Sequence, residues 1–142
     1  MYSLQTEGFL GYAVQDLMIP ADKVAHVQLG NNLEHALLVL TKTGYAAIPV
    51  LNPDFQLQGL ISTNKIMDSI LGLERIEFER LEKMKVEEVM NNQIPVLKLE
   101  DTLKKAINLV IDHPFLCVVN ENDVLEGIFT RRVILKQMKK NC

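Results

Sequence analysis

Four short blocks of this sequence recur in the same order about 70 residues later in the chain. The separation between a block and its copy drifts only from 72 to 68 residues, so the insertions between blocks are small. Repetition at a fixed period indicates a duplicated module, and modules of this size need each other to bury a core. The blocks and their copies are Asp16–Met18 and Glu88–Met90, Leu33–Leu37 and Leu103–Ile107, Ile48–Asn52 and Leu116–Asn120, and Gly59–Ser62 and Gly127–Thr130.

Each copy predicts the same order of elements, strand–helix–strand–strand–helix. The first helix of each copy is amphipathic, with apolar residues three and four apart. Gly44 is expected to end this helix in the first copy, and Pro114 limits it in the second because the residue before a proline disfavours helix. Turn-forming residues separate the last two strands of each copy, which are therefore expected to form hairpins. The predicted strands are Val24–Val27, Ala46–Leu51 and Leu57–Ile61, then Ile94–Leu97, Phe115–Val119 and Val124–Phe129, and the closing helices begin near Thr63 and Arg131.

The charged segment between the copies predicts a linker helix over Leu73–Met84. Within it, Glu79 and Lys83 are an i,i+4 pair in the favourable order. Leu73, Ile76 and Met84 are expected to cover an apolar surface. The predicted fold class is α/β, of the α+β type. Its expected parts are an N-terminal extension or helix at 1–13, a first repeat at 14–70, the linker helix at 71–85, a second repeat at 86–138 and a tail at 139–142.

The composition excludes several classes of protein. A chain of 142 residues with 48% hydrophobic residues and a net charge of −3 predicts a compact domain without general attraction to nucleic acid or anionic membranes. Two cysteines exclude a disulfide scaffold, and the three histidines and two cysteines lack metal-ligand spacing. No phosphate loop, catalytic triad or carboxylate pair stands in the sequence, so we expect neither enzymatic activity nor a cofactor. No apolar run is long enough to span a membrane, and the cytoplasm is the expected location.

Basic side chains gather near the C-terminal end, where no acidic side chain follows Gly127. Lysines late in a helix are typical of a solvated helix end that complements the dipole. Bases at the start of a helix oppose the dipole, whereas guanidinium groups and helix N-termini both bind phosphate oxygens. The two arginines that open the last helix are therefore candidates for phosphate binding; solvated arginines, or arginines paired with acids of the other copy, are the alternatives. The five bases are Arg131, Arg132, Lys136, Lys139 and Lys140.

The repeated order of elements resembles that of a CBS-domain pair over residues 12–138. The Ile48-Pro49-Val50 strand before a turn and the Gly59-x-x-Ser62 strand end after it carry this resemblance. It implies a Bateman module, in which two copies related by pseudo-twofold symmetry form nucleotide clefts between them. It also implies a sensor of adenosine nucleotides rather than a catalyst, and a disk-like homodimer in a head-to-head or head-to-tail arrangement.

The chain is also similar to the stand-alone CBS-pair proteins of Gram-positive bacteria that bind cyclic di-AMP. The similarity covers the N-terminal extension through Tyr12, Met18–Ala25, Gly44–Val50 and Thr130–Arg132. It implies cyclic di-AMP as the ligand and, since no enzyme or transporter domain is appended, an output that passes through a partner protein. The partner that the resemblance suggests is a (p)ppGpp synthetase/hydrolase, contacted when the second messenger is scarce.

The residues near the predicted strand ends bear on the identity of the ligand. In the broader CBS pattern, an Asp three residues after the strand-ending Ser or Thr binds a ribose. Here Lys65 follows Ser62 at that distance, and Val133 follows Thr130. Neither side chain accepts hydrogen bonds from two ribose hydroxyls as a carboxylate does. This departure disfavours AMP, ADP and ATP and favours a ligand with esterified 3′ oxygens and two phosphates.

Tyr45 is the candidate for stacking on adenine. It follows the helix-ending glycine and precedes Ala46 and Ala47, whose small side chains let a flat ligand approach the backbone. The other interpretation is a tyrosine at the edge of the core with its hydroxyl in water. The resemblance implies that backbone groups of both alanines and of Ala25 read the adenine edge. Lys23 is either a ligand neighbour or a surface lysine. The full predicted binding set is Lys23, Val24, Ala25, Tyr45, Ala46, Ala47, Ile48, Pro49, Thr130, Arg131 and Arg132.

The second copy departs from the first where the ligand would lie. Asp112–Phe115 replaces Gly44–Ala47 and brings bulky or rigid residues, so one cleft per chain is expected to bind. His113 is expected to be structural or exposed, because no nucleophile or paired acid accompanies it. Two other functions remain open, a sensor of AMP, ADP or ATP and a ligand-independent interaction scaffold.

Overall fold

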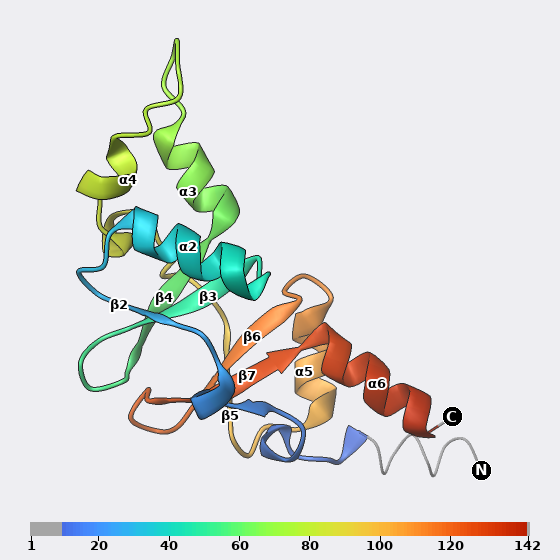
Figure 1. Cartoon of the computed structure of the whole chain (residues 1–142). Helices are drawn as coiled ribbons and strands as arrows, with labels where there is room; N and C mark the ends of the chain where they lie inside the picture. Colours follow the sequence, from blue (N-terminus) through green and yellow to red (C-terminus); the bar gives the residue numbers. More distant parts are fainter. Residues whose placement is uncertain (1–9, 142) are drawn as a thin grey trace. The chain divides into compact units, whose positions relative to one another are not determined.

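The computed structural model describes residues 10–141, which divide into two compact units (Figure 1). Unit 1 combines the described residues up to Val24 with those from Pro95 onward, and unit 2 is the continuous segment Ala25–Ile94. The two repeats therefore interchange their first segments, because Met18 belongs to unit 1 and Met90 to unit 2. The sequence pattern did not predict this interchange. Most of the predicted N-terminal helix lies outside the described residues.

Unit 2 is built on a sheet in the order β2-β3-β4. The first pairing is parallel, and the second is the predicted antiparallel hairpin. Asn91 bridges to Leu60 on the outer edge of this hairpin. The elements of unit 2 are β2 (Val27–Gln28), α2 (Leu33–Thr43), β3 (Ala47–Leu51), β4 (Leu57–Ser62), α3 (Thr63–Ile70), α4 (Arg80–Lys83) and the 3₁₀ turn η3 (Val86–Glu88).

Unit 1 repeats this topology with a sheet in the order β1-β7-β6-β5. Its edge strand β1 takes the place that the Asn91 bridge holds in unit 2, and it pairs antiparallel with β7. The elements of unit 1 are the 3₁₀ turn η1 (Val14–Asp16), β1 (Ile19–Pro20), the 3₁₀ turn η2 (Ala21–Lys23), β5 (Val96–Lys98), α5 (Leu103–Val110), β6 (Phe115–Val119), β7 (Leu125–Thr130) and α6 (Arg131–Asn141).

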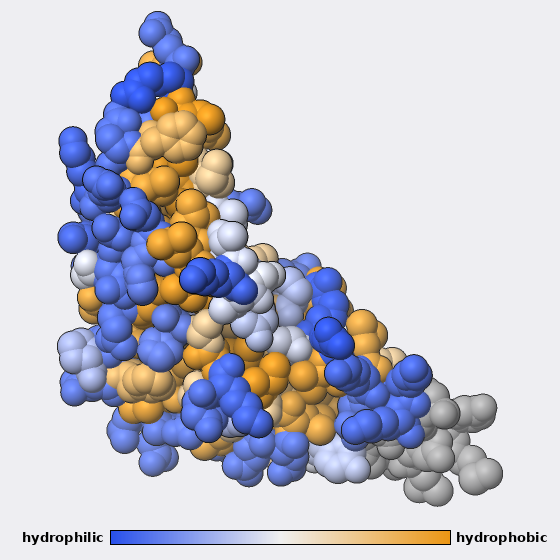
Figure 2. Space-filling view, in the orientation of Figure 1, coloured by the Kyte–Doolittle hydropathy of each residue, from blue (hydrophilic) through white to orange (hydrophobic). Residues whose placement is uncertain are grey.

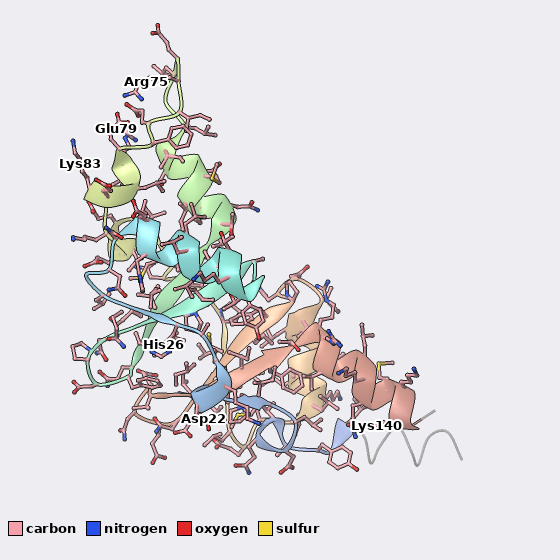
Figure 3. All side chains as sticks on the ribbon, in the orientation of Figure 1. Asp22, His26, Arg75, Glu79, Lys83 and Lys140 are labelled. Carbon is pink, nitrogen blue, oxygen red and sulfur yellow. The ribbon has the colours of Figure 1, made fainter. Side chains whose placement is uncertain are left out.

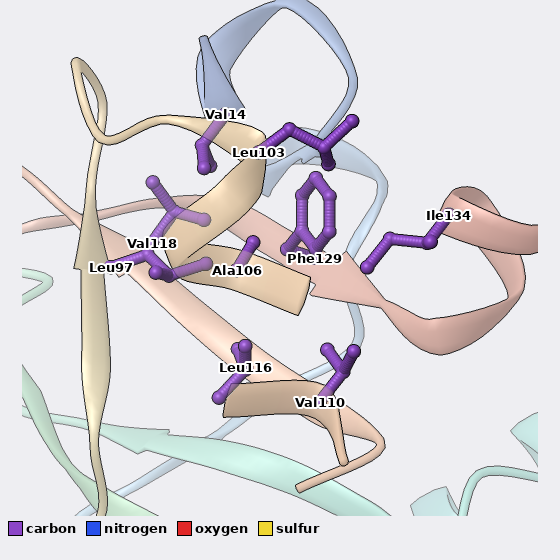
Figure 4. Close-up of a cluster of buried hydrophobic side chains, with 9 residues drawn as sticks. All are labelled: Val14, Leu97, Leu103, Ala106, Val110, Leu116, Val118, Phe129 and Ile134. Carbon is purple, nitrogen blue, oxygen red and sulfur yellow. The ribbon is translucent and has the colours of Figure 1, made fainter. Parts of the chain in front are cut away.

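Nine buried residues form the core of each unit, and they occupy equivalent positions in the two repeats. Figure 4 shows the core of unit 1. Each core takes one residue, Val14 or Val86, from the interchanged segment. The packing therefore confirms the duplication position by position. In unit 1 the core residues are Val14, Leu97, Leu103, Ala106, Val110, Leu116, Val118, Phe129 and Ile134, and in unit 2 they are Val86, Val27, Leu33, Ala36, Leu40, Ile48, Val50, Ile61 and Ile66.

A side-chain oxygen caps the start of each of the four longer helices among residues 10–141. Asn32, Ser62, Thr102 and Thr130 accept hydrogen bonds from the backbone N–H groups three residues later in α2, α3, α5 and α6. At the other end of α2, Gly44 has φ 77° and donates its N–H to the carbonyl of Leu40, which confirms the predicted stop.

Two predicted strands are shorter than expected. The chain forms the turn η2 up to Lys23, so β2 begins only at Val27 and not at Val24. In the second repeat, β5 begins at Val96 rather than Ile94. The segments that end at Met18 and Met90 contain the 3₁₀ turns η1 and η3.

The predicted linker helix over Leu73–Met84 is wrong for most of its length, because only Arg80–Lys83 is helical. Residues 70–77 form a tight hairpin instead, in which the Gly72 N–H donates to the Arg75 carbonyl and the Glu77 N–H to that of Ile70. These bonds and the bridge between Leu71 and Ile76 fold the segment back on itself, so the helix begins only at Arg80.

The hairpin between α3 and α4 exposes apolar side chains. Leu73 is fully exposed and Ile76 is 39% exposed, so these two side chains do not cover an apolar surface as predicted. Met84 does, because it packs against the core of unit 2. Apolar side chains interrupt the polar surface of unit 2 below this hairpin (Figure 2). The Arg75 guanidinium donates to the Glu79 carboxylate and lowers the pKa of Glu79 to about 2. Among the described residues, Glu79 forms its ion pair with Arg75 and not with Lys83 as the helical spacing predicted.

Candidate functional site

The predicted adenine-binding residues of unit 2 lie where the chain leaves α2 and enters β3. Gly44 in the left-handed conformation turns the chain, and Tyr45 follows with 37% of its surface exposed. Ala46 is exposed and Ala47 half-buried, whereas Ile48 and Pro49 are buried in the sheet. The exposed ring and the two small residues therefore share one edge of unit 2, as the spacing predicted.

The backbone at this edge is partly used by the fold. The carbonyl of Ala46 accepts a hydrogen bond of 3.1 Å from the N–H of Thr63, at the start of α3. No acceptor for the Ala46 N–H lies among the described residues. An exposed backbone donor beside a ring is suited to a planar heterocycle that presents a nitrogen acceptor.

Ala25 approaches the same edge along the parallel pairing of β2 and β3. Val27 pairs with Val50, so the register continued backward brings Ala25 beside Ile48. Ala25 is half-buried. Within unit 2 the structure thus brings Ala25 and Tyr45–Pro49 to one end of the sheet.

The equivalent strand end in unit 1 carries Thr130, Arg131 and Arg132. The Arg131 N–H donates to the carbonyl of Pro114 at 2.9 Å, which repeats the bond between Thr63 and Ala46 in unit 2. The hydroxyl of Thr130 accepts from the N–H of Val133 at 3.2 Å and caps α6. Both units therefore build the same strand-to-helix junction, and unit 1 alone places arginines on it.

The two arginines have different surroundings. The Arg131 guanidinium donates to the carbonyl of Val110 at 2.6 and 3.1 Å and to that of Ile111 at 3.1 Å, so it caps the C-terminal end of α5. Arg132 is exposed, and its guanidinium has no hydrogen bond or ion pair within residues 10–141. The sequence predicted phosphate binding for both arginines, because the spacing of neighbouring residues does not reveal a contact between α5 and α6.

Lys23 does not accompany the arginines within unit 1. Ile19 pairs with Ile128 and Pro20 with Gly127, so the antiparallel register carries the chain away from Thr130 as it approaches Lys23. Lys23 ends η2 with an exposed side chain, and the following Val24 is buried. Lys23 therefore lies beside Val24 and Ala25 in the sequence and not beside Thr130 in the sheet of unit 1.

The second repeat differs at the edge that corresponds to Tyr45. Pro114 and Phe115 replace Ala46 and Ala47 there, and Asp112 and His113 are exposed. In the part of the chain that the structure describes, no group of three or more His, Cys, Asp or Glu could hold a metal ion. None of the described helices is long and apolar enough to cross a membrane.

Comparison with known families identifies both repeats. The family described as "CBS domain" matches residues 14–72 and 86–140, most of the chain. The chain belongs to the CBS domain family. Its fold is a CBS-domain pair of mixed α+β class, in which each compact unit is completed by a segment from the start of the other CBS repeat.

Related proteins cover almost the whole CBS pair. Cyclic di-AMP receptor B of Bacillus subtilis (strain 168) is 60% identical over 141 residues, which are 99% of this chain and 96% of the relative. The crystal structure of a CBS domain-containing protein from Bacillus anthracis is 64% identical, with a TM-score of 0.90 over 96% of this chain and 99% of that one. The Listeria monocytogenes CbpB protein in complex with c-di-AMP is 60% identical, with a TM-score of 0.84 over 89% of this chain and 95% of that one.

Proposed function

We propose that this protein is a receptor for cyclic di-AMP that controls a partner protein according to its occupancy, and that it catalyses no reaction. The observation that carries the proposal is 60% identity over nearly the full length to a relative named as a cyclic di-AMP receptor. A structure of similar identity holds the same ligand. CBS pairs bind different nucleotides, so the residues of this chain must also suit the ligand.

The exposed groups of the two strand ends suit the two chemical parts of cyclic di-AMP. We assign phosphate binding to Arg132, whose guanidinium is not engaged by the fold of residues 10–141 and can bind a phosphate bidentately. We assign adenine stacking to Tyr45, with backbone groups of Ala25, Ala46 and Ala47 reading the base edge. Lys23, Val24, Ile48, Pro49 and Thr130 complete the proposed set, and Arg131 serves it by holding the end of α5.

The positions that bind ribose hydroxyls in other CBS pairs are unsuited to that task here. Lys65 and Val133 stand in the first turns of α3 and α6, and their N–H groups donate to the capping oxygens of Ser62 and Thr130. Neither position offers a carboxylate. A cyclic dinucleotide esterifies its 3′ oxygens and so does not require one, which favours it over AMP or ATP.

Titration calorimetry with cyclic di-AMP, cyclic di-GMP, AMP and ATP tests the proposal. We expect cyclic di-AMP to bind most tightly. Arg132→Ala should weaken this binding roughly 10- to 100-fold, as expected for a lost charged hydrogen bond. Tyr45→Ala should weaken it roughly tenfold through lost stacking. Lys136→Ala is the matched control, because it removes an exposed base one turn later on α6.

Arg131→Ala separates the structural arginine from the ligand-binding one. It removes the cap of α5 and should cost about 1–2 kcal/mol of stability, whereas Arg132→Ala should leave the free energy of unfolding unchanged. The proposal fails if ATP binds more tightly than cyclic di-AMP, or if neither Arg132→Ala nor Tyr45→Ala weakens binding.

The same proposal includes a partner, an assembly and a location. We propose a (p)ppGpp synthetase/hydrolase as the partner and a disk-like homodimer as the assembly, both in the cytoplasm, where the buried free thiol of Cys117 persists. Cosedimentation with the purified enzyme should succeed without cyclic di-AMP and fail at saturating ligand.

Sedimentation velocity of the protein alone should give twice the mass of the chain; a monomer at all concentrations rejects the homodimer.

A further inference from the structure

The turn between β3 and β4 holds a phenylalanine in a conformation that disfavours it. Phe55 has φ 66°, in the left-handed region where bulky residues are rare. Its ring meets the ring of His26 edge to face, with centroids 5.0 Å apart. His26 lies on the extended segment that leads into β2 (Figure 3).

The equivalent turn of unit 1 shows that the fold itself does not require an aromatic residue. Asp123 occupies the same position with φ 63°. Both turns are closed by the same backbone bond, from the residue with positive φ to Asn52 or Asn120 three positions earlier. In each turn the asparagine Oδ1 also accepts from two backbone N–H groups. Asp tolerates this conformation better than Phe, so unit 2 carries backbone strain that unit 1 avoids.

The partner of the ring also differs between the repeats. Val27 pairs with Val50, and Leu97 pairs with Val118, so the position of His26 corresponds to Val96. The second repeat therefore has neither ring of the pair. The ring contact exists only in the repeat whose strand edge carries Tyr45 and the two small alanines.

We propose that Phe55 is a positioning residue for the ligand edge of unit 2, acting through His26 on the backbone of Ala25. The segment before β2 lies outside the strand itself, because β2 spans only Val27 and Gln28. A ring against His26 fixes this segment on the sheet, and with it the orientation of the adjacent Ala25 peptide groups. The contact between the two rings offsets the cost of the left-handed backbone conformation of Phe55.

This inference rests on the proposed function, since it deepens the role of Ala25 in reading the ligand. It does not require that His26 touch the ligand. Because an edge-to-face ring pair contributes modestly, its loss should lower the affinity for cyclic di-AMP about three- to tenfold.

The test compares Phe55→Asn with Phe55→Tyr. Asparagine accepts the left-handed conformation and removes the ring, so the turn and the thermal midpoint should be preserved. Cyclic di-AMP affinity should nevertheless fall about three- to tenfold, and amide hydrogen–deuterium exchange over residues 24–29 should quicken in the free protein. Phe55→Tyr keeps the ring and should retain both properties. Asp123→Asn, at the equivalent turn, is the matched control and should change neither.

A double-mutant cycle tests the route through His26. His26→Ala should lower affinity as much as Phe55→Asn, and the double variant should lose no more than either single variant. Additive losses would show that the two rings act independently and would overturn the inference. So would wild-type affinity or unaltered exchange in Phe55→Asn, with the proposed function left standing. If the unsubstituted protein does not bind cyclic di-AMP, the proposed function itself fails, and the binding role of Phe55 fails with it.

Discussion

Gly127 sits where the interchanged segment of unit 1 meets its sheet, and replacing it with alanine tests that packing directly. A Cβ atom at Gly127 would overlap the carbonyl oxygen of Ile19 and approach the sulfur of Met18 to 2.9 Å. The carbonyl belongs to the backbone of β1, which is paired with β7 and cannot rotate aside. The overlap must therefore be relieved by separating the two strands.

The expected loss in the free energy of unfolding is large because the added methyl group meets backbone rather than a flexible side chain. Overpacking against backbone costs about 3 kcal/mol, the upper part of the usual range, which corresponds to a fall in Tm of roughly 10 °C for a chain of this length. Gly59→Ala is the equivalent change in unit 2. Its Cβ would lie 2.7 Å from the carbonyl oxygen of Asn91, a smaller overlap, so we expect about 2 kcal/mol.

Urea unfolding followed by circular dichroism measures these costs, with Gly30→Ala as the control. Gly30 has φ 90°, but a methyl group added there would meet no atom within 4 Å, so its substitution reports backbone strain alone, about 1 kcal/mol. If Gly127→Ala costs no more than Gly30→Ala, the segment around Met18 is not packed on β7 and the interchange of segments is incorrect.

Three further outcomes are expected. Leu73→Lys should change the free energy of unfolding by less than about 0.5 kcal/mol, because the side chain is fully exposed; a larger loss in urea unfolding would favour the linker helix. Burial raises the pKa of Asp101, but hydrogen bonds from the Lys98 N–H and from Lys105 outweigh it and leave the pKa below its usual value. Asp101→Asn should therefore lower the free energy of unfolding by about 0.5–1 kcal/mol at pH 7. This difference from the unsubstituted protein should disappear as the pH falls below about 4 and through the folded-state pKa of Asp101. A loss of stability that does not depend on pH would contradict this. Burial raises the pKa of Cys117 to about 12, so peptide mapping should find it unmodified by iodoacetamide at pH 8 until urea unfolds the protein.

Local signals in the sequence were sufficient for most elements of the fold. The periodicity of the apolar residues, the stop at Gly44 and the turn residues around Asn52 and Asn120 each act within a few positions. The linker was mispredicted because its apolar spacing is compatible with a helix, whereas the backbone hydrogen bonds from Gly72 to Arg75 and from Glu77 to Ile70 close a hairpin there. The interchange of segments could not be predicted, since either sheet offers an edge to the block at Met18 or Met90.

The positions of the candidate site residues in the fold were predictable to a similar extent. The edge formed by Tyr45, Ala46 and Ala47 follows from neighbours along the chain. The cap that Arg131 places on α5 and the ring contact between Phe55 and His26 both join residues more than 20 positions apart. Contacts between residues so far apart in the sequence depend on the tertiary packing, which the spacing of residues in one sequence does not predict.

The interchange of first segments also sets an order for synthesis on the ribosome. Ala25–Ile94 is continuous and carries every strand that its sheet needs, so it can fold while the chain is still growing. Ile19 and Pro20 are made earlier, but their partners in β7 follow about a hundred residues later. At roughly 5–20 residues per second, the oldest segment waits on the order of 5–20 seconds for its sheet. The unit whose first residues are translated first is thus the last to be completed.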